Sequence, residues 1–372
     1  MKVILERDAF LDVLTHVQGI VERRNTIAIL SNVLLVAENG VLSVVATNLD
    51  IEMRERVAAE IAADGAITAS AHMLHDIVRE LPEGAQIELS AEADAASLTL
   101  VSGKSVFSLQ ALPQADFPVM PADDLPVAFA LPAADLRRLI AKTQFAISDA
   151  ETRRYLNGLY LHAVEEEGAA LLRAVATDTH RLALAQVPQP VGAADMPAII
   201  VPAKTVGELY RLLSDDTGEV SVALSATRIS FTFDQVGFTS KLIDGAYPDY
   251  ARVIPTAHDK TFSVDKADFI QVVNRVAAIS SEKSRAVKLS VDDGKVVFSV
   301  SHPDSGSAND ELAAADANAA AEIGFNARYL VDIARRIDGA RAIFEFSGPD
   351  EATLMRDSDD SDSLYVIMPM RV

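Results

Sequence analysis

The sequence contains no cysteine and no tryptophan among its 372 residues, and these absences exclude several classes of protein. A chain without cysteine has no disulfide framework, no thiol nucleophile and no cysteine-ligated zinc site. Because no run of eighteen apolar residues occurs, no membrane-spanning helix is predicted. The opening residues, MKVILERDAF, place acids where a secretory signal requires an apolar core, so we expect a cytoplasmic protein.

Basic residues are also scarce, since 33 Lys and Arg stand against 54 Asp and Glu, which gives a formal net charge of −21. A protein that binds nucleic acid over its whole surface needs the opposite balance, because each phosphate contact requires a cation. The composition leaves room for a local basic face only. The length predicts two or three domains, at roughly 100–200 residues each.

One pattern occurs three times along the chain, at a spacing of roughly 125 residues. Each copy begins with a short extended segment, a polar residue and then apolar residues at helical spacing, in the segments 4–17, 129–143 and 262–276. The corresponding apolar position is occupied by Phe10, Leu136 and Phe269. Because the order of elements agrees between the copies, we interpret the chain as a threefold repeat. Three unrelated domains of the same class are the alternative.

Each copy continues with strands that alternate apolar and polar residues around a turn. The pairs Asn-Gly, Glu-Gly and Asp-Gly, which predict β-hairpins, interrupt the alternation in 32–47, 157–177 and 287–301. A second helix and further hairpins follow, with helices predicted in 67–81, 199–213 and 323–337. The fold class is therefore α+β, with helices on one face of antiparallel sheets. Proline-rich connectors at 112–126 and 244–259 place the three domains at 1–120, 126–250 and 256–372.

Charge is distributed unevenly between the predicted helices and the rest of the chain. The helix windows 8–18, 71–80, 134–145, 203–213, 266–278 and 327–337 hold eleven Lys or Arg and eight Asp or Glu. All other residues together hold 22 basic and 46 acidic side chains. The helices are thus mildly basic, whereas strands and loops are strongly acidic. Taken alone, this excess is also what an ordinary solvated helix face carries.

Two motifs have the residue types of a ligand site without its spacing. The tetrapeptide SGKS at 102–105 resembles the end of a phosphate-binding loop, but Leu98 stands where that loop needs glycine. A strand-forming sequence follows it instead of a helix, so we predict a hairpin turn. His72 and His75 share one helix face without a third nearby ligand, which favours a solvated face. We therefore predict no metal and no cofactor.

Polar and apolar side chains gather at three further places. Asp178 and His180 lie at the end of a predicted strand and offer a general acid–base pair, so a cytosolic hydrolase is an alternative function. The apolar C-terminal segment 364–372 contains two methionines and suits an adaptable groove for a partner, or an ordinary last strand. Basic loop residues suited to phosphate contacts lie in corresponding places of the first two copies, at Arg23, Arg24, Arg153, Arg154 and Tyr155.

Several segments together resemble one known family. They are YLNG (155–158), TDTHRL (177–182), LPQADFP (112–118), FTSKLIDGAYPDYARVIP (238–255), IGFN (323–326) and MPMRV (368–372). Over the whole chain and in order, they resemble the β subunit of bacterial DNA polymerase III, the DNA sliding clamp family. The resemblance implies three clamp domains and no catalysis. It also implies a head-to-tail homodimer that closes into a ring, with helices inside and sheets outside.

A packing estimate agrees with that implication. Helices pack about 8–10 Å apart, so twelve on a circle enclose a bore of roughly 25 Å. Such a bore passes duplex DNA, whereas six helices from one chain leave only about 7 Å. A ring of two chains would hold DNA by topology, through weak and sequence-independent phosphate contacts that permit sliding. The mildly basic helices and the acidic remainder fit this division.

The resemblance also implies a pocket between the second and third domains. It would receive short apolar peptides from the DNA polymerase III α subunit, the clamp loader and repair polymerases. The matching residues are Leu156, Thr177, Thr179, His180, Arg181, Leu182, Pro248, Arg252, Val253, Asn326, Tyr329, Val366, Met368, Pro369, Met370 and Arg371. A polar rim would surround an apolar floor, which is expected to consist of Leu156, Leu182, Val253, Val366 and Met368. His180 becomes a wall of the pocket in this interpretation.

Two further sets of residues follow from the resemblance. DNA contact is expected from the loop residues Arg24, Arg153, Arg154, Tyr155 and Lys204. The dimer interface is expected to include Lys104, Phe107, Leu109, Ile279 and Asp304. In that interface Lys104 would face the acids Asp304, Asp310 and Glu311.

Three positions depart from the family pattern. Thr179 stands where a smaller residue is usual, and we expect it to narrow the pocket. Ala28 replaces an expected proline, which would loosen its loop. The acidic stretch 357–362, DSDDSD, is interpreted as a solvated loop specific to this chain.

Overall fold

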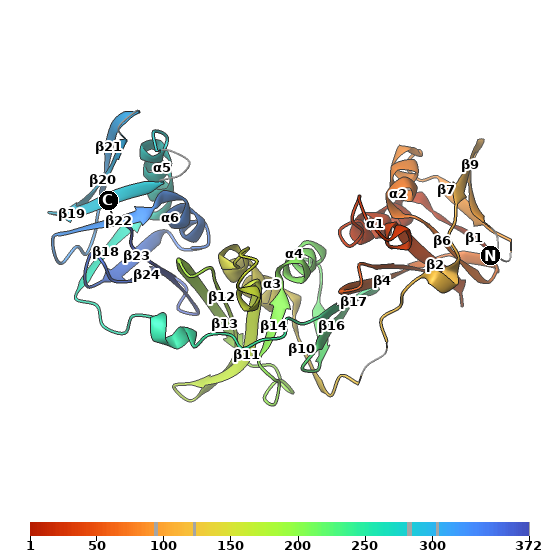
Figure 1. The fold of residues 1–372 in the computed structure, drawn as a ribbon, viewed down its shortest axis with the longest axis horizontal. Helices are drawn as coiled ribbons and strands as arrows, with labels where there is room; N and C mark the ends of the chain where they lie inside the picture. Colours follow the sequence, from red (N-terminus) through yellow and green to blue (C-terminus); the bar gives the residue numbers. More distant parts are fainter. Residues whose placement is uncertain (93–95, 122–123, 281–284, 303–304, 372) are drawn as a thin grey trace. The chain divides into compact units, whose positions relative to one another are not determined.

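The computed structural model describes residues 1–92, 96–121, 124–280, 285–302 and 305–371. Within these ranges each predicted helix window holds a helix (Figure 1). The helices are α1 (Arg7–Val17), α2 (Ala71–Glu80), α3 (Ala133–Thr143), α4 (Ala203–Leu212), α5 (Lys266–Ala277) and α6 (Ala327–Ala334). Short 3-10 helices are η1 (Ala28–Ser31), η2 (Gln114–Asp116), η3 (Gln144–Ala146), η4 (Arg154–Leu156) and η5 (Tyr250–Val253). In the described part of the chain, no helix combines the length and the apolar character that crossing a membrane requires.

The described strands form four antiparallel sheets. The first sheet consists, in order, of β5 (Glu60–Ala63), β1 (Lys2–Glu6), β7 (Gln86–Ser90), β8 (Ser97–Ser102) and β9 (Ser105–Gln110). The second consists of β10 (Val127–Pro132), β15 (Glu219–Leu224), β16 (Arg228–Phe233), β17 (Val236–Lys241), β4 (Ile51–Ala58), β3 (Val41–Thr47), β2 (Asn32–Glu38) and β6 (Gly65–Ser70).

The third sheet also has eight strands. They are β14 (Ile199–Pro202), β11 (Gly158–Glu166), β12 (Ala169–Thr177), β13 (Arg181–Pro188), β25 (Ser363–Ile367), β24 (Thr353–Asp357), β23 (Arg341–Phe346) and β18 (Lys260–Asp265). The fourth sheet consists of β21 (Gly306–Ala313), β20 (Lys295–His302), β19 (Ala286–Asp292) and β22 (Ala321–Asn326).

The chain divides into two compact units. The first consists of Met1–Ala134, Val191–Pro197 and Gly207–Leu242, and it contains the first two sheets. The second consists of Asp135–Pro190, Ala198–Val206 and Ile243–Val372, and it contains the other two sheets. Each eight-stranded sheet joins four strands of the middle repeat to four strands of a neighbouring repeat. The middle repeat is therefore shared between the two units.

Two ladders join the repeats edge to edge. In the first unit β4 pairs with β17, and Ile51 lies opposite Ser240. In the second unit β13 pairs with β25, and Arg181 lies opposite Ile367. Backbone hydrogen bonds thus continue across each junction, and no strand edge is left open there. Within the described chain, the outer sheets end in the edge strands β5 and β9 and in the edge strands β21 and β22.

The predicted hairpins are confirmed by their turn geometry. Asn39 and Gly40 have φ values of 54° and 79°, and Asp293 and Gly294 have φ values of 45° and 76°. Positive φ at both turn residues is the type I′ geometry that two-residue hairpins favour. The SGKS segment is likewise a two-residue turn, because Ser102 pairs with Ser105 between β8 and β9.

The helices cover one face of the sheets and contribute to the core. α1 packs against α2 and against strands β3 and β4, and α5 packs against α6, β20 and β21. The repeated apolar position is buried in each copy, since Phe10 and Phe269 are 0% exposed and Leu136 is 5% exposed. The polar start signal acts as a cap at α2, α5 and α6, where the side chains of Ser70, Asp265 and Asn326 accept a backbone hydrogen bond.

Candidate functional site

A tight turn at 177–181 organises the candidate site. Thr177 Oγ1 donates to the carbonyl of Arg181 (2.7 Å) and accepts from the amide of Thr179 (3.1 Å). The carboxylate of Asp178 accepts from the amides of His180 and Arg181, at 2.9 and 3.0 Å. Thr179 has a φ of 78°, which is unfavourable for a β-branched residue. Asp178 thus serves the turn, and no hydrogen bond between its carboxylate and the His180 ring occurs in the described structure.

Arg181 connects this turn to its surroundings and is only 8% exposed. Its Nε donates to Asp178 (3.1 Å), its Nη1 to Asp332 (2.7 Å) and its Nη2 to the carbonyl of Phe145 (2.8 Å). The guanidinium carbon lies 4.4 Å from the centre of the Tyr329 ring and 5.0 Å from that of Phe145. Because each of its three nitrogens has an internal partner, Arg181 positions the wall of the site.

Aromatic and sulfur-containing side chains stand beside the turn. The rings of His180 and Tyr329 lie nearly parallel, with 24° between their planes and 6.2 Å between their centres. Burial, followed by the charge of Asp178, raises the pKa of Tyr329, so its phenol stays neutral. The amide of Met368 donates to the carbonyl of His180 (2.9 Å), and the side chain of Met368 is 41% exposed. The C-terminal segment is therefore docked at the turn and leaves apolar surface accessible.

The residues expected in the apolar floor differ in their exposure. Leu156, Leu182 and Val366 are each 2% exposed. Leu182 and Val366 pack in one cluster, which the partly buried Tyr160, Tyr247, Tyr250 and Ile254 cover. Val253 and Met368, which were expected in the floor, are 52% and 41% exposed. Neither side chain is therefore part of a buried floor.

The remaining predicted pocket residues belong to the connector and to the chain end. Pro248 is exposed, and Arg252 pairs with Asp249 through its Nε at 2.8 Å. Asn326 accepts from the amide of Arg328 (3.0 Å) and thereby caps α6. Pro369 is half-buried between exposed neighbours, Met370 is 36% exposed and bonds through its amide to the carbonyl of Gly324 at 2.8 Å, and Arg371 is exposed.

The residues expected to contact DNA lie in both units. Arg24 is exposed in the first unit, and the second holds Arg153, Arg154, Tyr155 and Lys204. The amide of Ala203 donates to the carbonyl of Asn157 (3.0 Å), which brings Lys204 close to the loop that contains η4. Nη1 of Arg153 donates to Thr179 Oγ1 (3.1 Å). The basic loop of the middle repeat therefore touches the turn of the candidate pocket.

Three of the residues expected at the dimer interface lie on or next to the edge strand β9. On or next to β9, Lys104 is exposed, Phe107 is half-buried and Leu109 is 4% exposed. Ile279 is half-buried after α5, and Asp304 lies outside the described residues. The acids expected to face Lys104 have partners within their own chain. Asp310 pairs with Arg275 at 2.7 Å and Glu311 with Lys295 at 3.0 Å.

The acidic stretch 357–362 is a solvated loop only in part, since Ser358, Asp359, Ser361 and Asp362 are exposed, whereas Asp357 ends β24 and Asp360 is half-buried. Asp357 is 6% exposed, and its carboxylate accepts from the amide of Asp338 at 2.6 Å. Asp360 accepts from Nη2 of Arg138 at 2.6 Å. Burial opposes ionisation of Asp360, but the hydrogen bond from Ser363 and the charge of Arg138 outweigh it and lower the pKa. The stretch joins the third repeat to α3 of the middle repeat.

Three acids of this region lie close enough to share a metal ion, namely Asp338, Asp357 and Asp360. The ammonium of Lys142 stands among them, 2.8 Å from Asp338 and 3.5 Å from Asp360. Lys142 is 4% exposed, so its charge remains with the acids. The group is an internal ion-pair network, in which the lysine supplies the positive charge.

His72 and His75 are more buried than the expected solvated face. Nε2 of His72 lies 3.1 Å from the carbonyl of Val21. The side chain of His75 is 12% exposed and lies 3.5 Å from Asp76. Both histidines are therefore partly buried and not fully solvated.

Sequence reasoning missed Asp332 and Phe145, the two residues that hold Arg181 from outside the turn. Asp332 lies three residues after Tyr329, so both belong to one face of α6. That spacing is a usable signal once Tyr329 is assigned. Phe145 contributes a carbonyl from η3, and backbone contacts of this kind leave no mark in the sequence.

Comparisons with known proteins assign the family. Three family models of the DNA polymerase III beta subunit match this chain in order. The model of the N-terminal domain matches residues 1–121, that of the central domain 130–249 and that of the C-terminal domain 251–371. The chain belongs to the DNA polymerase III beta subunit family. A beta sliding clamp from Caulobacter vibrioides is 49% identical over 372 residues, with 100% of both chains covered.

Solved structures of the family have the same fold. A sliding clamp from Bartonella birtlesii bound to griselimycin has a TM-score of 0.97 and 46% identity, with 100% of both chains covered. A beta sliding clamp from C. crescentus with PEG bound has a TM-score of 0.97 and 49% identity, covering 100% of this chain and 99% of that one. The resemblance drawn from the motifs is confirmed, and so is the fold of three clamp domains.

Proposed function

We propose that this chain is a DNA sliding clamp, two copies of which close head to tail around duplex DNA and hold the replicative polymerase on it. The construction of the sheets is the observation that carries the proposal. Each repeat joins the next through edge strands, in the β4–β17 and β13–β25 ladders. The same joint made between two chains, with β9 of one protomer against β21 of its partner, would close a ring and pair these two edge strands.

The two edge strands support this joint by their exposure. On β9, Val106 is 67% exposed, although valine normally faces a core or a partner. On β21, exposed and half-buried residues alternate from Ser307 to Ala313, and none of the residues of the strand is buried. A long exposed edge promotes aggregation unless another strand covers it, so a second copy of the chain is the natural cover.

A closed ring needs no catalysis to keep a polymerase on its template. The family is a non-catalytic processivity factor, and the engagement of Asp178 by main-chain amides is consistent with this role. Topology holds the duplex, so contacts from the basic loops at Arg24, Arg153, Arg154, Tyr155 and Lys204 can be weak and blind to sequence. Weak contacts are what sliding requires.

The surface beside the turn 177–181 is the proposed docking site for partners. Exposed methionines and the stacked ring of His180 offer apolar area over a buried floor, which suits a short apolar peptide. Such peptides would come from the DNA polymerase III α subunit, the clamp loader and repair polymerases.

We also propose that the three domains span 1–120, 126–250 and 256–372. The proposed location of the protein is the cytoplasm, at the nucleoid.

Retention on circular DNA tests the proposed function. Clamps loaded on a nicked circle should stay bound through moderate salt and should leave when the circle is cut. Equal loss from circular and linear DNA at the same salt would indicate ordinary electrostatic binding. Sedimentation should give the mass of two chains, and a single protomer at working concentration would contradict the ring.

A further inference from the structure

Helix α3 of the middle repeat directs two cations toward the third repeat. Arg138 and Lys142 are four residues apart and therefore share one face of the helix. Nη2 of Arg138 donates to both carboxylate oxygens of Asp360, at 2.6 and 2.7 Å. The ammonium of Lys142 donates to the carbonyl of Arg336 (2.5 Å), and Lys142 is 4% exposed. Because a buried ammonium has lost its hydration, these partners must replace the water that it gave up.

The carbonyl that Lys142 holds belongs to the end of α6. Arg336 lies two residues after Ala334, the last residue of that helix. The hydroxyl of Tyr365 on β25 donates to the same carbonyl (3.4 Å). Carbonyls at this end of a helix have no partner within the helix and carry the negative end of its dipole, so a cation stabilises them. The C-terminal end of α6 is thus tied to α3 by Lys142.

Two acids of the third repeat pair with Lys142 at the same place. Its ammonium lies 2.8 Å from Asp338 and 3.9 Å from Asp357. The side chain of Asp357 is 0% exposed, and its carboxylate accepts from the amide of Gly339 at 3.1 Å. Lys142 is the ionic partner of Asp357 in the described chain. Removing the ammonium alone would therefore leave a buried carboxylate without its counter-charge.

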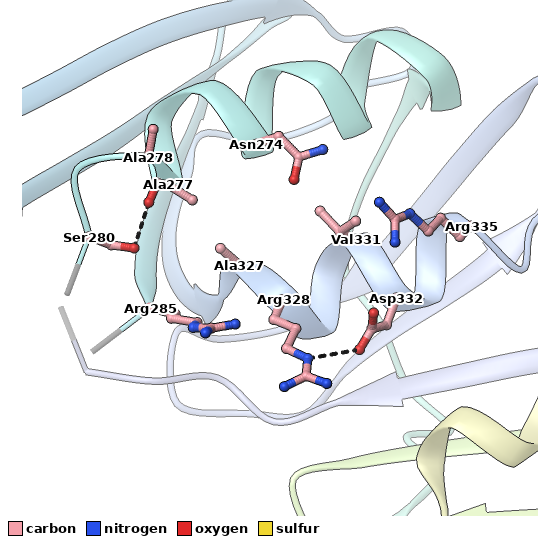
Figure 2. Close-up of a pocket in the computed structure, with 10 residues that line it drawn as sticks. All are labelled: Asn274, Ala277, Ala278, Ser280, Arg285, Ala327, Arg328, Val331, Asp332 and Arg335. Carbon is pink, nitrogen blue, oxygen red and sulfur yellow. Dashed lines mark hydrogen bonds and ion pairs between the residues drawn. The ribbon is translucent and has the colours of Figure 1, made fainter. Parts of the chain in front are cut away.

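The same helix carries one wall of the proposed docking site. Figure 2 shows Asp332 on α6, where it pairs with Arg328 at 3.7 Å. Asp332 also accepts from Nη1 of Arg181 at 2.7 Å, and the ring of Tyr329 lies against that of His180. A helix of eight residues is about 12 Å long, so a displacement of its C-terminal end also moves Tyr329.

We propose that Lys142 is a positioning residue for peptide docking, which keeps α6 where the docking site needs it. The inference rests on the proposed function, because the site joins His180 of the middle repeat to Tyr329 of the third. In the described chain, the polar contacts of Lys142 are with the carbonyl of Arg336 and with three acids, and none of these residues belongs to the site. A docked peptide would therefore be affected by Lys142 through α6 alone.

The first unit offers a matched control. Nη2 of Arg211 on α4 donates to the carbonyl of His16 (2.7 Å), in the last turn of α1. A cation of the middle repeat thus again caps a helix of a neighbouring repeat. Here the acidic partner, Glu208, lies on the helix of Arg211 itself at 2.9 Å, and the side chain of Arg211 is 39% exposed. R211M therefore removes an equivalent cap in the unit that does not contain the docking site.

The test compares K142M, R211M and K142M/D357N in the full-length protein. The probe is a fluorescent apolar peptide, selected from a random library because it binds the wild type and not M368K. Anisotropy measures its affinity, and urea denaturation measures the stability of each variant. K142M/D357N removes the buried charge that K142M leaves unpaired, so it should recover stability, and it carries the comparison if K142M does not fold.

K142M should lower the affinity for the peptide about tenfold, within the usual range for coupling between separate sites. R211M should leave this affinity unchanged. K142M/D357N should keep the loss of affinity although its stability recovers, because the tie between α3 and α6 is still absent. Unchanged affinity in K142M, equal losses in K142M and R211M, or recovery of affinity together with stability in the double variant would each overturn the inference. If no apolar peptide discriminates the wild type from M368K, the docking site itself is refuted and the inference falls with it.

Discussion

The two junctions between repeats share one backbone turn. In the first junction, Thr47 Oγ1 donates to the carbonyl of Ile51 (2.8 Å) and accepts from the amide of Leu49 (3.1 Å). Thr177 makes the same pair of bonds in the second junction, at 2.7 and 3.1 Å. Leu49 and Thr179 have φ values of 77° and 78°. The repeat is therefore preserved down to individual hydrogen bonds.

The surfaces over these turns differ. The amide of Lys241 donates to the carbonyl of Asp50 (2.8 Å), as the amide of Met368 does to that of His180 (2.9 Å). Over the first turn, the side chains of Lys241 and Asp50 form an exposed ion pair at 3.1 Å. Over the second, Met368 is exposed and His180 lies against Tyr329. The comparison teaches that side chains, on a shared backbone, restrict the proposed peptide site to one junction.

Removing Arg181 should give the largest loss of stability, because its buried charge holds two acids. The first junction has Ile51 at the corresponding position and needs no ion pair there. R181M leaves Asp332 and Asp178 without their buried cation and should lower the free energy of unfolding by about 3 kcal/mol. I51M exchanges one buried apolar side chain for another and should cost less than about 1.5 kcal/mol. Urea denaturation measures both, and equal costs would contradict the positioning role of Arg181.

Exchanging the surface side chains of the two turns should remove the difference in peptide binding between the junctions. H180D/M368K places the residues of the first junction over the second turn. The loss of apolar contact should weaken binding of an apolar partner peptide about 100-fold, since one methionine contributes roughly 1.5–3 kcal/mol. The reverse exchange, D50H/K241M, should leave that affinity unchanged. Calorimetric titration measures both, and unchanged binding to H180D/M368K would remove the pocket assignment.

Glycine at the strained turn position should stabilise both junctions slightly. The left-handed conformation costs an L-residue about 1–2 kcal/mol, which glycine avoids. Glycine also makes the unfolded chain more flexible, and this entropy offsets part of the gain. L49G should therefore gain up to about 1 kcal/mol. T179G should gain less, because it also loses the hydrogen bond from Arg153 at 3.1 Å. Thermal melting measures both variants, and a loss of stability in both would contradict the strain assigned to this turn position.

The smallest expected effect concerns pH. His162 occupies the strand position that Val36 has in the first repeat, and its Nε2 lies 3.0 Å from the Tyr250 hydroxyl. Burial, aided by the charge of Arg173, lowers the pKa of His162 below 6.5 despite its bond to the carbonyl of Ala163. Below about pH 6.5 the unfolded chain takes up a proton that the folded chain does not, so the free energy of unfolding falls as pH falls. H162V should reduce that dependence, measured by urea denaturation at pH 5.5 and 7.5, and an unchanged dependence would contradict this assignment.

Sequence alone determined the local elements of this protein. Hairpins follow from two-residue turns with positive φ, and helices follow from apolar spacing and side-chain caps, because both signals act within a few residues of each other. The motifs also determined the family, since each occurs at its expected place along the chain. The same motifs contain most of the proposed pocket residues, including Leu182 and His180.

Only the tertiary structure decided how the repeats are joined and what the charges do. The β13–β25 ladder pairs residues nearly two hundred positions apart, and nothing local in the sequence specifies that register. Arg181 and Asp360 look like surface charges in the sequence, yet both are held by side chains from other elements. Whether a charged side chain is solvated or paired depends on what the fold places beside it, which is a long-range property of the chain.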